Sequence, residues 1–355
     1  MPAPWNADDF RHQVQIVLDD FLDAQAERLR PMGEDAARLL ADARVCVAGG
    51  KRFRAAFTYW GHLAVSPTPV DADALSRVCA ALELLQASAL VHDDYMDASD
   101  TRRGRPATHR AFEAQHRAAG WRGDPVQYGA AAAILLGDLL LSWSDELLRT
   151  CGLGAEQVAA ALDVFDLCRT EVITGQFLDV SVQARGRADV EAAMTVLRFK
   201  SAKYSVERPL HIGAALGGAT EDQMAQLSAF GLPLGEAFQL RDDILGVYGD
   251  PEHTGKPAGD DLVEGKRTVL VALALEGLDE TGATRLDTAL GTDLSEADVA
   301  ELRGLITASG GRDQVEALID DLLARSLTAL EAADLDARAK GVLRELAEAA
   351  TSRTV

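Results

Sequence analysis

Aromatic residues and asparagine are scarce in this sequence. Aromatics make up only 5% of the 355 residues, and Asn6 is the only asparagine. Runs of β-branched residues are short, whereas Ala and Leu recur along the whole chain. Helix propensity therefore dominates almost every window, and the sequence predicts an all-α protein in which no strand competes.

Cysteine pairs and long apolar runs are also missing. Cys46, Cys79, Cys151 and Cys168 are widely spaced and form no C-x-x-C pair, which argues against a structural zinc site or a disulfide framework. The N-terminus has no basic segment followed by an apolar stretch, and no uninterrupted run of about 18 apolar residues occurs. We expect a cytoplasmic, soluble protein without an integral membrane segment.

Basic residues are outnumbered. The chain has 35 Lys and Arg against 56 Asp and Glu, a net charge of -21, which repels nucleic acid and anionic membrane surfaces. We therefore expect no nucleic-acid partner. A chain this acidic binds an anionic substrate only through local basic clusters or bridging cations, and the sequence contains both features.

The organisation of the chain indicates a single domain that spans residues 1–355. Length alone leaves one or two domains open, but the chain has no internal repeat and no Pro/Ser-rich linker. Apolar periodicity predicts helices near 6–30, 34–48, 52–65, 72–97, 127–151, 155–184, 189–217, 221–248 and 260–277, with two or three more in the tail. Loops are expected at 66–71, 98–126 and 249–259.

Sequence signals for helix ends support these boundaries. Asn6 is a candidate N-cap, and the pairs Thr220 with Gln223 and Ser295 with Asp298 resemble capping boxes. We expect Gly231 and Gly310 to end or kink a helix.

The first acidic motif is DDYMD, at the end of a strongly apolar predicted helix. Asp93 and Asp97 are one helical turn apart on the same face, and Asp94 lies about 100° round from Asp93. A helix tolerates such a cluster when a cation neutralises it, and hard carboxylate oxygens suit Mg²⁺ bridged to substrate phosphates. The alternative is a solvated acidic face. The apolar stretch from Leu82 to Val91 favours the mouth of an apolar cavity instead.

A second acidic pair and three basic segments complete the pattern. Asp242 and Asp243 again end a long apolar helix, and a glycine-rich loop with Lys256 and Lys266 follows. Such a loop can close over phosphate. A second basic segment is Arg102 with Arg103, which suit either the carboxylates or a diphosphate. The third is GGKRFR at 49–54, where a helix start also favours an anion; the alternative is a basic helix start without a ligand.

Taken in order, GGKRFR, DDYMDASDTRRGRPATH, GQFLD, KSAKY and FQLRDDILGVYGDPEHTGKPAGDDL resemble the motif set of trans-isoprenyl diphosphate synthases (the polyprenyl synthetase family), most of all the bacterial geranylgeranyl diphosphate synthases. The resemblance spans residues 49–268. It implies the isoprenoid synthase fold, roughly a dozen helices around a deep central cavity, and a homodimer. It also implies a magnesium-dependent prenyltransferase that joins isopentenyl diphosphate to C5, C10 and C15 allylic diphosphates.

The resemblance implies roles residue by residue. Three Mg²⁺ ions, with Mn²⁺ as an alternative, are expected on Asp93, Asp97 and Asp242. The implied catalytic residues are Asp93, Asp97, Arg102, Lys200, Asp242 and Lys256. The residues expected to bind the two diphosphates are Lys51, Arg54, Gln86, Arg102, Arg103, Lys200, Gln239, Lys256 and Lys266. Residues expected to support these are Asp94, Gln176, Asp179, Asp243 and Asp261.

The second acidic motif departs from the family pattern, because Gly246 stands where the family has a third Asp. We expect this loss to weaken water-mediated support of a metal ion rather than to abolish catalysis.

Product length is expected to depend on the residues four and five positions before Asp93. These are Ala89 and Ser88, which lie roughly 6 to 7.5 Å below the metal site on a helix. Because both are small, a C15 chain can pass, and we predict a C20 product, geranylgeranyl diphosphate. The alternatives are farnesyl diphosphate and a longer polyprenyl product.

Other functions fit the sequence less well. A class I terpene cyclase would share the first acidic motif but would normally need an Asn/Ser/Glu metal triad, and it has no use for the GGKRFR segment. A catalytically silent partner subunit or a lipid-binding protein should have lost site residues. Apart from the third position of the second motif, the site residues are present.

Overall fold

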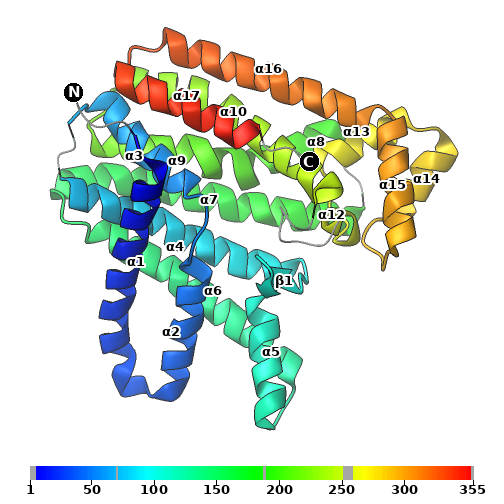
Figure 1. Ribbon diagram of the computed structural model, residues 1–355, viewed down its shortest axis with the longest axis horizontal. Helices are drawn as coiled ribbons and strands as arrows, with labels where there is room; N and C mark the ends of the chain where they lie inside the picture. The colour runs from blue at the N-terminus through cyan, green and yellow to red at the C-terminus, as the bar shows by residue number, and fades with distance from the viewer. Residues whose placement is uncertain (1–4, 69–70, 187–188, 251–258, 353–355) are drawn as a thin grey trace.

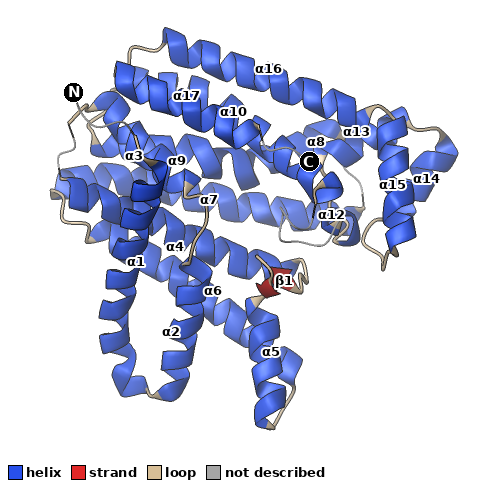
Figure 2. Ribbon diagram, in the orientation of Figure 1, coloured by secondary structure: helices blue, strands red, loops and turns tan. Residues whose placement is uncertain are grey.

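The computed structural model describes residues 5–68, 71–186, 189–250 and 259–352. The first half of the chain forms α1 (Ala7–Leu29), the 3-10 turn η1 (Arg30–Met32), α2 (Glu34–Val47), α3 (Phe53–Val65), α4 (Ala72–Met96), the strands β1 (Thr101–Arg102) and β2 (Arg105–Pro106), α5 (Thr108–Ala119), α6 (Pro125–Arg149) and α7 (Ala155–Arg185). The second half forms α8 (Val190–Val196), the π-helix η2 (Leu197–Glu207), α9 (Arg208–Leu216), α10 (Glu221–Tyr248), α12 (Asp260–Val263), α13 (Val269–Gly277), α14 (Glu280–Ala289), α15 (Glu296–Ala308), α16 (Gly311–Ala332) and α17 (Ala337–Thr351). The all-α prediction is confirmed (Figures 1 and 2).

Helix caps follow local sequence chemistry. The side chain of Asn6 accepts the backbone N–H of Asp8 at 3.0 Å, and both predicted capping boxes are present. Gly310, with a φ of +77°, marks the boundary before α16. Gly231 lies within α10, so it does not end a helix, and its predicted role as a kink stays a prediction. An added Cβ there would come 2.8 Å from Leu210 Cδ1, so the glycine allows close packing.

Three predicted segments differ in detail. Residues 98–126 contain an antiparallel hairpin, in which Thr101 pairs with Pro106, and the helix α5; the prediction of a loop without strands is wrong there. The buried face of α5 has one large apolar residue, Phe112, beside Thr108, His109 and His116, so few apolar residues mark this helix in the sequence. The helix expected at 260–277 divides at Gly265 (φ +75°), and the tail forms α14 to α17.

The apolar core surrounds the long helices that carry the motifs. One cluster joins α4 to α1, α6 and α7. A second joins α10 to α13, α15 and α16, and a third joins α3 to α9, α10 and α17. The ends of α4 and α10 that carry the acidic motifs lie at the same side of the molecule, near β1 and α12 (Figure 1).

Two helices are long and apolar enough to cross a membrane by length and composition. They are α4 and α6, and the apolar windows of the two helices are 72% and 39% buried inside the protein. The core helix of a globular protein can be equally long and apolar. Because α4 is mostly buried, its apolar composition is explained by its place in the core. The apolar surface of α6 is less covered.

Two glycines allow the π-helix η2 to lie between α7 and α10. A Cβ on Gly175 of α7 would come 2.4 Å from the backbone nitrogen of Lys200, and one on Gly235 of α10 would come 2.4 Å from the carbonyl oxygen of Ala202. Since real Cβ atoms do not approach so closely, glycine is required at both positions. The motif lysine Lys200 is thereby placed directly beside α7.

Candidate active site

The carboxylates of the first acidic motif meet residues from two other helices. Asp93 Oδ1 accepts hydrogen bonds from Gln176 Nε2 of α7 at 2.9 Å and from Lys200 Nζ of η2 at 3.2 Å. Lys200 Nζ also donates to Asp179 Oδ2 at 2.6 Å. The structure thus brings together four residues that lie in three separate motifs of the sequence.

Lys266 links the C-terminal end of α4 to the segment around α12. Its Nζ lies 3.2 Å from Asp97 Oδ2, 2.6 Å from Glu264 Oε2 and 3.7 Å from Asp261 Oδ1. The other carboxylate oxygen of Glu264, Oε1, accepts a hydrogen bond from Ser99 Oγ at 2.6 Å. The segment after α12 is therefore attached to the first acidic motif by ion pairs and by one hydrogen bond.

The two lysines set the charge states of this cluster. Burial alone would favour a neutral carboxyl, but Lys200, Lys266 and Arg102 hold the pKa of Asp93 well below its usual range. Burial and the neighbouring charge of Asp93 raise the pKa of Asp97. Burial would lower the pKa of Lys200, yet Asp93 and Asp179 raise it above its ordinary value. The site therefore holds charged lysines beside at least one ionised carboxylate, that of Asp93.

Arg102 is fixed by the middle carboxylate of the first motif. Its Nε donates to Asp94 Oδ1 at 2.8 Å, and its Nη2 lies 3.8 Å from Asp93 Oδ2. Asp94 is buried. The guanidinium is therefore held at the rim of the carboxylate cluster, where it can contact an anion bound there.

The second acidic motif lies at the end of α10. Asp243 is buried and accepts a hydrogen bond from Gln239 Nε2 at 2.8 Å. Burial raises the pKa of Asp243 to about 8, an effect that Gln239 opposes and that Asp261 and Asp242 reinforce. Asp242 precedes it and is half-buried. Lys256 lies outside the described residues, so its predicted role stays a prediction.

The basic residues near the N-terminus form a separate group. Arg54 Nη2 donates to Ser205 Oγ at 2.7 Å, and its guanidinium lies 4.4 Å from the centre of the Tyr204 ring. The Tyr204 hydroxyl donates to Gln86 Oε1 at 2.7 Å. Arg54 and Gln86, which the resemblance assigns to one substrate, are thus connected through η2.

Arg103 approaches the same group from the β1–β2 hairpin. Its Nη1 donates to the carbonyl oxygen of Ala48 at 2.8 Å, and its Nη2 would lie 3.2 Å from a Cβ on Gly50. Lys51 follows Gly50 directly. The hairpin therefore places Arg103 beside the GGKRFR segment, although about 50 residues separate them in the sequence.

Arg52 has a structural role that the sequence did not indicate. Its Nη1 donates to Glu83 Oε2 at 2.8 Å, and its Nη2 donates to Gln15 Oε1 at 2.7 Å. Arg52, Ala98 and Arg103 are the non-glycine residues with positive φ in the described parts of the chain. All three lie within the GGKRFR and DDYMDASDTRRGRPATH motifs, and residues in such sparsely populated backbone conformations cluster at active sites.

Sequence reasoning also missed Ser99, Glu264, Tyr204 and Ser205. Glu264 lies two positions before Lys266, and Tyr204 ends the KSAKY motif, so proximity to a motif was a usable signal for both. Nothing in the sequence connects Ser99 with Glu264, because their contact spans 165 positions.

The donor set fits a metal ion shared with the substrate. Within the described residues, no group of three or more His, Cys, Asp or Glu side chains could hold a metal ion by itself. Asp97 Oδ2 is nevertheless buried and accepts no hydrogen bond. Mg²⁺ typically uses one or two carboxylates together with substrate phosphates and water, so Asp93 and Asp97 suit Mg²⁺ bound with a diphosphate.

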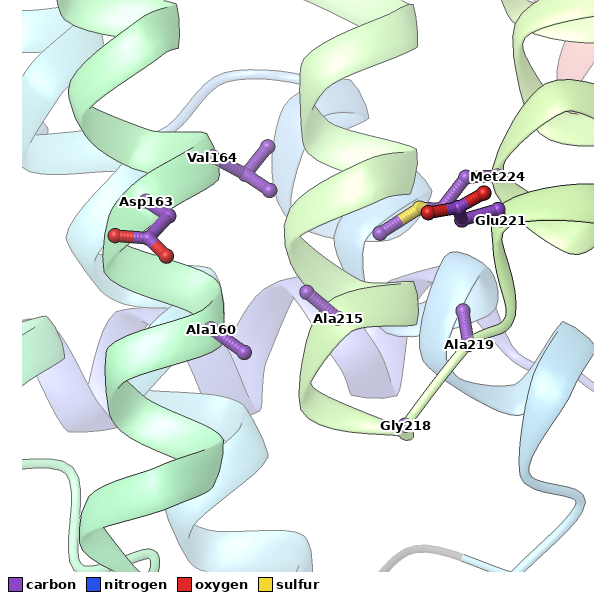
Figure 3. A pocket seen from close by; sticks show the side chains of 8 residues that line it. All are labelled: Ala160, Asp163, Val164, Ala215, Gly218, Ala219, Glu221 and Met224. Carbon is purple, nitrogen blue, oxygen red and sulfur yellow. The ribbon is translucent and has the colours of Figure 1, made fainter.

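An open pocket lies elsewhere, between α7, the end of α9 and the start of α10 (Figure 3). It has a volume of about 740 Å³ and is lined by Ala160, Asp163, Val164, Ala215, Gly218, Ala219, Glu221 and Met224. On α7, Val164 is twelve residues from Gln176, or roughly 18 Å along the helix. The pocket is therefore separate from the acidic cluster, and we assign it no part in the chemistry.

Comparison with known proteins identifies the same family along most of the chain. The family model described as polyprenyl synthetase matches residues 37–306. A solved structure of geranylgeranyl pyrophosphate synthase from Corynebacterium glutamicum, complexed with isoprenyl diphosphate and magnesium, superposes with a TM-score of 0.96. The two sequences are 41% identical, and the match covers 99% of this chain and 100% of the other.

Two curated relatives show how product names vary. A short chain isoprenyl diphosphate synthase from Methanothermobacter thermautotrophicus is 33% identical over 87% of this chain and 89% of its own. Heptaprenyl diphosphate synthase component 2 from Geobacillus stearothermophilus is 32% identical over 89% of this chain and 88% of its own. Product length thus differs among proteins of similar distance from this one.

Proposed function

Because the chain belongs to the polyprenyl synthetase family, we propose that it is a prenyltransferase that extends C5, C10 and C15 allylic diphosphates with isopentenyl diphosphate up to geranylgeranyl diphosphate (C20). The observation that carries this proposal is the meeting of Asp93, Gln176 and Lys200 from three motifs at one point. The C20 product is supported by the similarity to the geranylgeranyl pyrophosphate synthase of C. glutamicum.

The proposal assigns the two diphosphates to the two basic groups. The allylic diphosphate would lie against Arg102, Lys200 and Lys256, with Gln239 and Lys266 beside it. Isopentenyl diphosphate would lie against Lys51, Arg54, Gln86 and Arg103. Asp93, Asp97 and Asp242 would hold Mg²⁺, for which the buried Asp97 Oδ2, paired with the Lys266 ammonium but without a hydrogen bond, is a fitting ligand. Bound Mg²⁺ would neutralise negative charge on the departing diphosphate.

The side chains around Asp93 are proposed to assist the ionisation of the allylic diphosphate and the condensation that follows. Lys200, fixed by Asp93 and Asp179, needs no rearrangement to meet the charge that develops on the leaving group. The apolar length of α4 below Asp93 keeps water from the allylic cation. The isopentenyl double bond then attacks, and the departed diphosphate accepts the final proton, so no separate side-chain base is needed.

Chain length is assigned to the residues below the first motif on α4. Ser88 is buried and donates its hydroxyl to the carbonyl oxygen of Gly137 on α6 at 2.8 Å. Ala89 is half-buried. We propose that Ala89 and Ser88 together leave room for a C15 chain, with Ala89 as the more accessible of the two.

The chain is further proposed to act as a single domain and a cytoplasmic homodimer. Support for one domain comes from the long-range pair Arg241–Glu316 and from the backbone bond of Asp336 to Ala64. Support for a dimer comes from exposed apolar side chains on α7, where Ile173, Phe177 and Val180 recur at helical spacing.

The direct test supplies purified protein with Mg²⁺, labelled isopentenyl diphosphate and, separately, C5, C10 and C15 allylic diphosphates, followed by chromatography of the dephosphorylated products. We expect geranylgeraniol from all three starters. A shorter or longer alcohol would correct the product length alone. A cyclic hydrocarbon would overturn the proposal in favour of a terpene cyclase, and no product without a second subunit would favour a component of a heteromer.

A further inference from the structure

Arg52 is the middle cation of the GGKRFR segment, and its environment differs from that of the other two. Lys51 is exposed and Arg54 is half-buried, whereas the side chain of Arg52 is only 4% exposed. Arg52 also has a φ of +55°, in the left-handed region that residues with a side chain rarely adopt. Because its guanidinium is buried among protein groups, Arg52 is not placed to meet a substrate that arrives from solution.

The guanidinium of Arg52 connects the segment to three helices. Its Nη1 donates to Glu83 Oε2 of α4 at 2.8 Å. Its Nη2 donates to Gln15 Oε1 of α1 at 2.7 Å and to the carbonyl oxygen of Val47, the last residue of α2, at 2.5 Å. A sparsely populated backbone conformation persists where the surrounding contacts over-determine it. These three hydrogen bonds therefore account for the left-handed conformation of residue 52.

One face of α4 holds the segment over successive turns. Cys79, Glu83 and Gln86 are four and three residues apart, so they share this face. Cys79 Sγ donates to the carbonyl oxygen of Ala55 at 3.3 Å, just after the segment ends. The same helix reaches Asp93 ten residues after Glu83, or roughly 15 Å along its axis. The helix α4 thus carries both the first acidic motif and the partner of the buried guanidinium.

We propose that Arg52 is a positioning residue for isopentenyl diphosphate. Paired with Glu83, it holds the GGKRFR segment in register with α4, so that Lys51 and Arg54 lie at a fixed distance from the first acidic motif. Arg52 itself does not touch the substrate. The inference rests on the proposed function, in which Lys51 and Arg54 bind isopentenyl diphosphate.

Two variants separate positioning from stability. Arg52→Met leaves the carboxylate of Glu83 buried without a counter-charge, which is strongly destabilising. Arg52→Met/Glu83→Leu removes both charges and keeps apolar volume, and such replacements of a buried ion pair are often neutral for stability. We therefore expect the melting temperature to fall in the single variant and to return close to the wild-type value in the double variant.

The Michaelis constants report on positioning. In both variants the KM for isopentenyl diphosphate should rise about 10- to 100-fold, because a misplacement of about 1 Å can cost up to about 100-fold. The KM for the allylic diphosphate should stay unchanged. Arg52→Lys keeps the charge beside Glu83 but not the planar fork that reaches three partners, so its KM should lie between those of the wild type and Arg52→Met. A purely stabilising role would restore KM together with the melting temperature in the double variant.

Arg44→Gln is the matched control. Arg44 Nη2 donates to Asp23 Oδ1 at 2.6 Å, so it also links α2 to α1, but it lies outside the GGKRFR segment. This variant should leave both KM values unaltered.

Calorimetric titration with isopentenyl diphosphate, in the absence of an allylic substrate, gives a readout that does not depend on turnover. Its Kd should rise in Arg52→Met/Glu83→Leu by the same factor as KM. A wild type that binds isopentenyl diphosphate but forms no product would overturn the proposed function alone, whereas a wild type that does not bind it would overturn both.

Two outcomes would overturn the present inference alone. The first is wild-type affinity for isopentenyl diphosphate in the double variant or, should that variant not fold, in Arg52→Lys. The second is an equal rise in KM for both substrates, since the effect would then not be specific to the group around the GGKRFR segment.

Discussion

At the scale of single residues, lysine ammonium groups approach the carboxylates of the first motif from two sides. Lys200 contacts Asp93, and Lys266 contacts Asp97. Both lysines are also tied to a further carboxylate, Asp179 for one and Glu264 for the other. Each ammonium group is thus positioned before substrate arrives, which lowers the ordering cost of binding an anion.

Ala89 offers the sharper test of chain length. A phenyl ring at this half-buried position, roughly 6 Å below Asp93 on α4, should block a growing C15 chain, so Ala89→Phe is expected to shift the product from C20 to C15. Product chromatography with a C5 starter measures the shift. At Ser88 a ring would instead press on α6, because Ser88 Oγ lies 2.8 Å from the carbonyl oxygen of Gly137.

Ser88→Ala is the matched control. It removes one buried hydrogen bond without adding volume, so it should cost about 1 kcal/mol of stability and leave the C20 product unchanged. A folded Ala89→Phe enzyme that still releases C20 would refute the assignment of Ala89 to the cavity wall.

His211 predicts an acid-dependent loss of stability. Arg208 Nη1 donates to His211 Nδ1 at 3.1 Å, so this nitrogen is the acceptor, and Nε2 lies 3.0 Å from Ser228 Oγ. Burial lowers the pKa of His211 from 6.5, Arg208 adds to the effect, and Glu207 opposes it. The unfolded chain therefore takes up a proton first as the pH falls below about 6.5, so stability is present above that value and is lost on acidification.

Denaturant unfolding at pH 7.0 and at acid pH measures this dependence. His211→Asn keeps an acceptor for Arg208 and removes the titration, so its stability should depend less steeply on pH, by up to about 1.4 kcal/mol per pH unit. His12→Asn, at an exposed position on α1, is the control. An unchanged slope in His211→Asn would show that other groups carry the acid sensitivity.

At the scale of elements, the position of Lys200 depends on how closely η2 approaches α7. Gly175→Ala would place a Cβ 2.4 Å from the backbone nitrogen of Lys200, so η2 would have to shift. We expect a loss of about 1 to 3 kcal/mol in unfolding free energy and a fall in kcat of about 10- to 100-fold, since Lys200 would lose its place beside Asp93. Denaturant unfolding and steady-state kinetics on one preparation measure both.

Gly304→Ala provides the comparison. Gly304 is exposed within α15, and an added Cβ would meet nothing within 4 Å, so the same substitution there should gain about 1 kcal/mol from helix propensity and leave kcat unaltered. Gly175→Ala with the stability and kcat of the wild type would contradict the close approach of η2.

Elements were predictable where local signals agree with the fold. Three of the long helices, α1, α4 and α10, begin at residues whose side chains cap them, Asn6, Asp71 and Thr220. The π-helix was not predictable, because its extra backbone width is imposed by contact with α7 and α10. The helix α5 was not predicted, because its buried face contains two histidines and only one large apolar residue, Phe112.

The candidate site divides in the same way. Spacing and charge pointed to the two acidic motifs and the basic segments, whereas Gln86, Gln176 and Lys200 could be named only through the resemblance to the family. The pairs Tyr204 with Gln86 and Ser99 with Glu264 could not be predicted, because each contact joins segments that only the folded chain brings together.

At the scale of the whole molecule, the apolar face of α7 determines the expected assembly. Ile173 is 57% exposed and would be buried against the same face of a second copy in a two-fold dimer. Ile173→Glu should therefore leave an unpaired charge in the interface and weaken the dimer by about 3 kcal/mol, roughly 100-fold in Kd. Light scattering during size-exclusion chromatography over a concentration series measures the change.

Met32→Glu, at a 69% exposed position on η1, changes the charge by the same amount away from α7 and should leave the assembly unaltered. A wild-type protein that is monomeric at all concentrations, or an Ile173→Glu protein as dimeric as the wild type, would exclude this face as the interface.

The contact of Lys266 with Asp97 also has a consequence for biosynthesis. On the ribosome, Lys266 is added about 170 residues after Asp97, which at typical elongation rates is a delay of roughly 10 to 30 s. During that interval Asp97 lacks its lysine partner, and Asp93 gains Lys200 only after 107 residues, whereas Arg102, which contacts Asp94, follows within a few residues. The nascent N-terminal half must therefore rely on this short-range arginine and on cellular cations until the second half is translated.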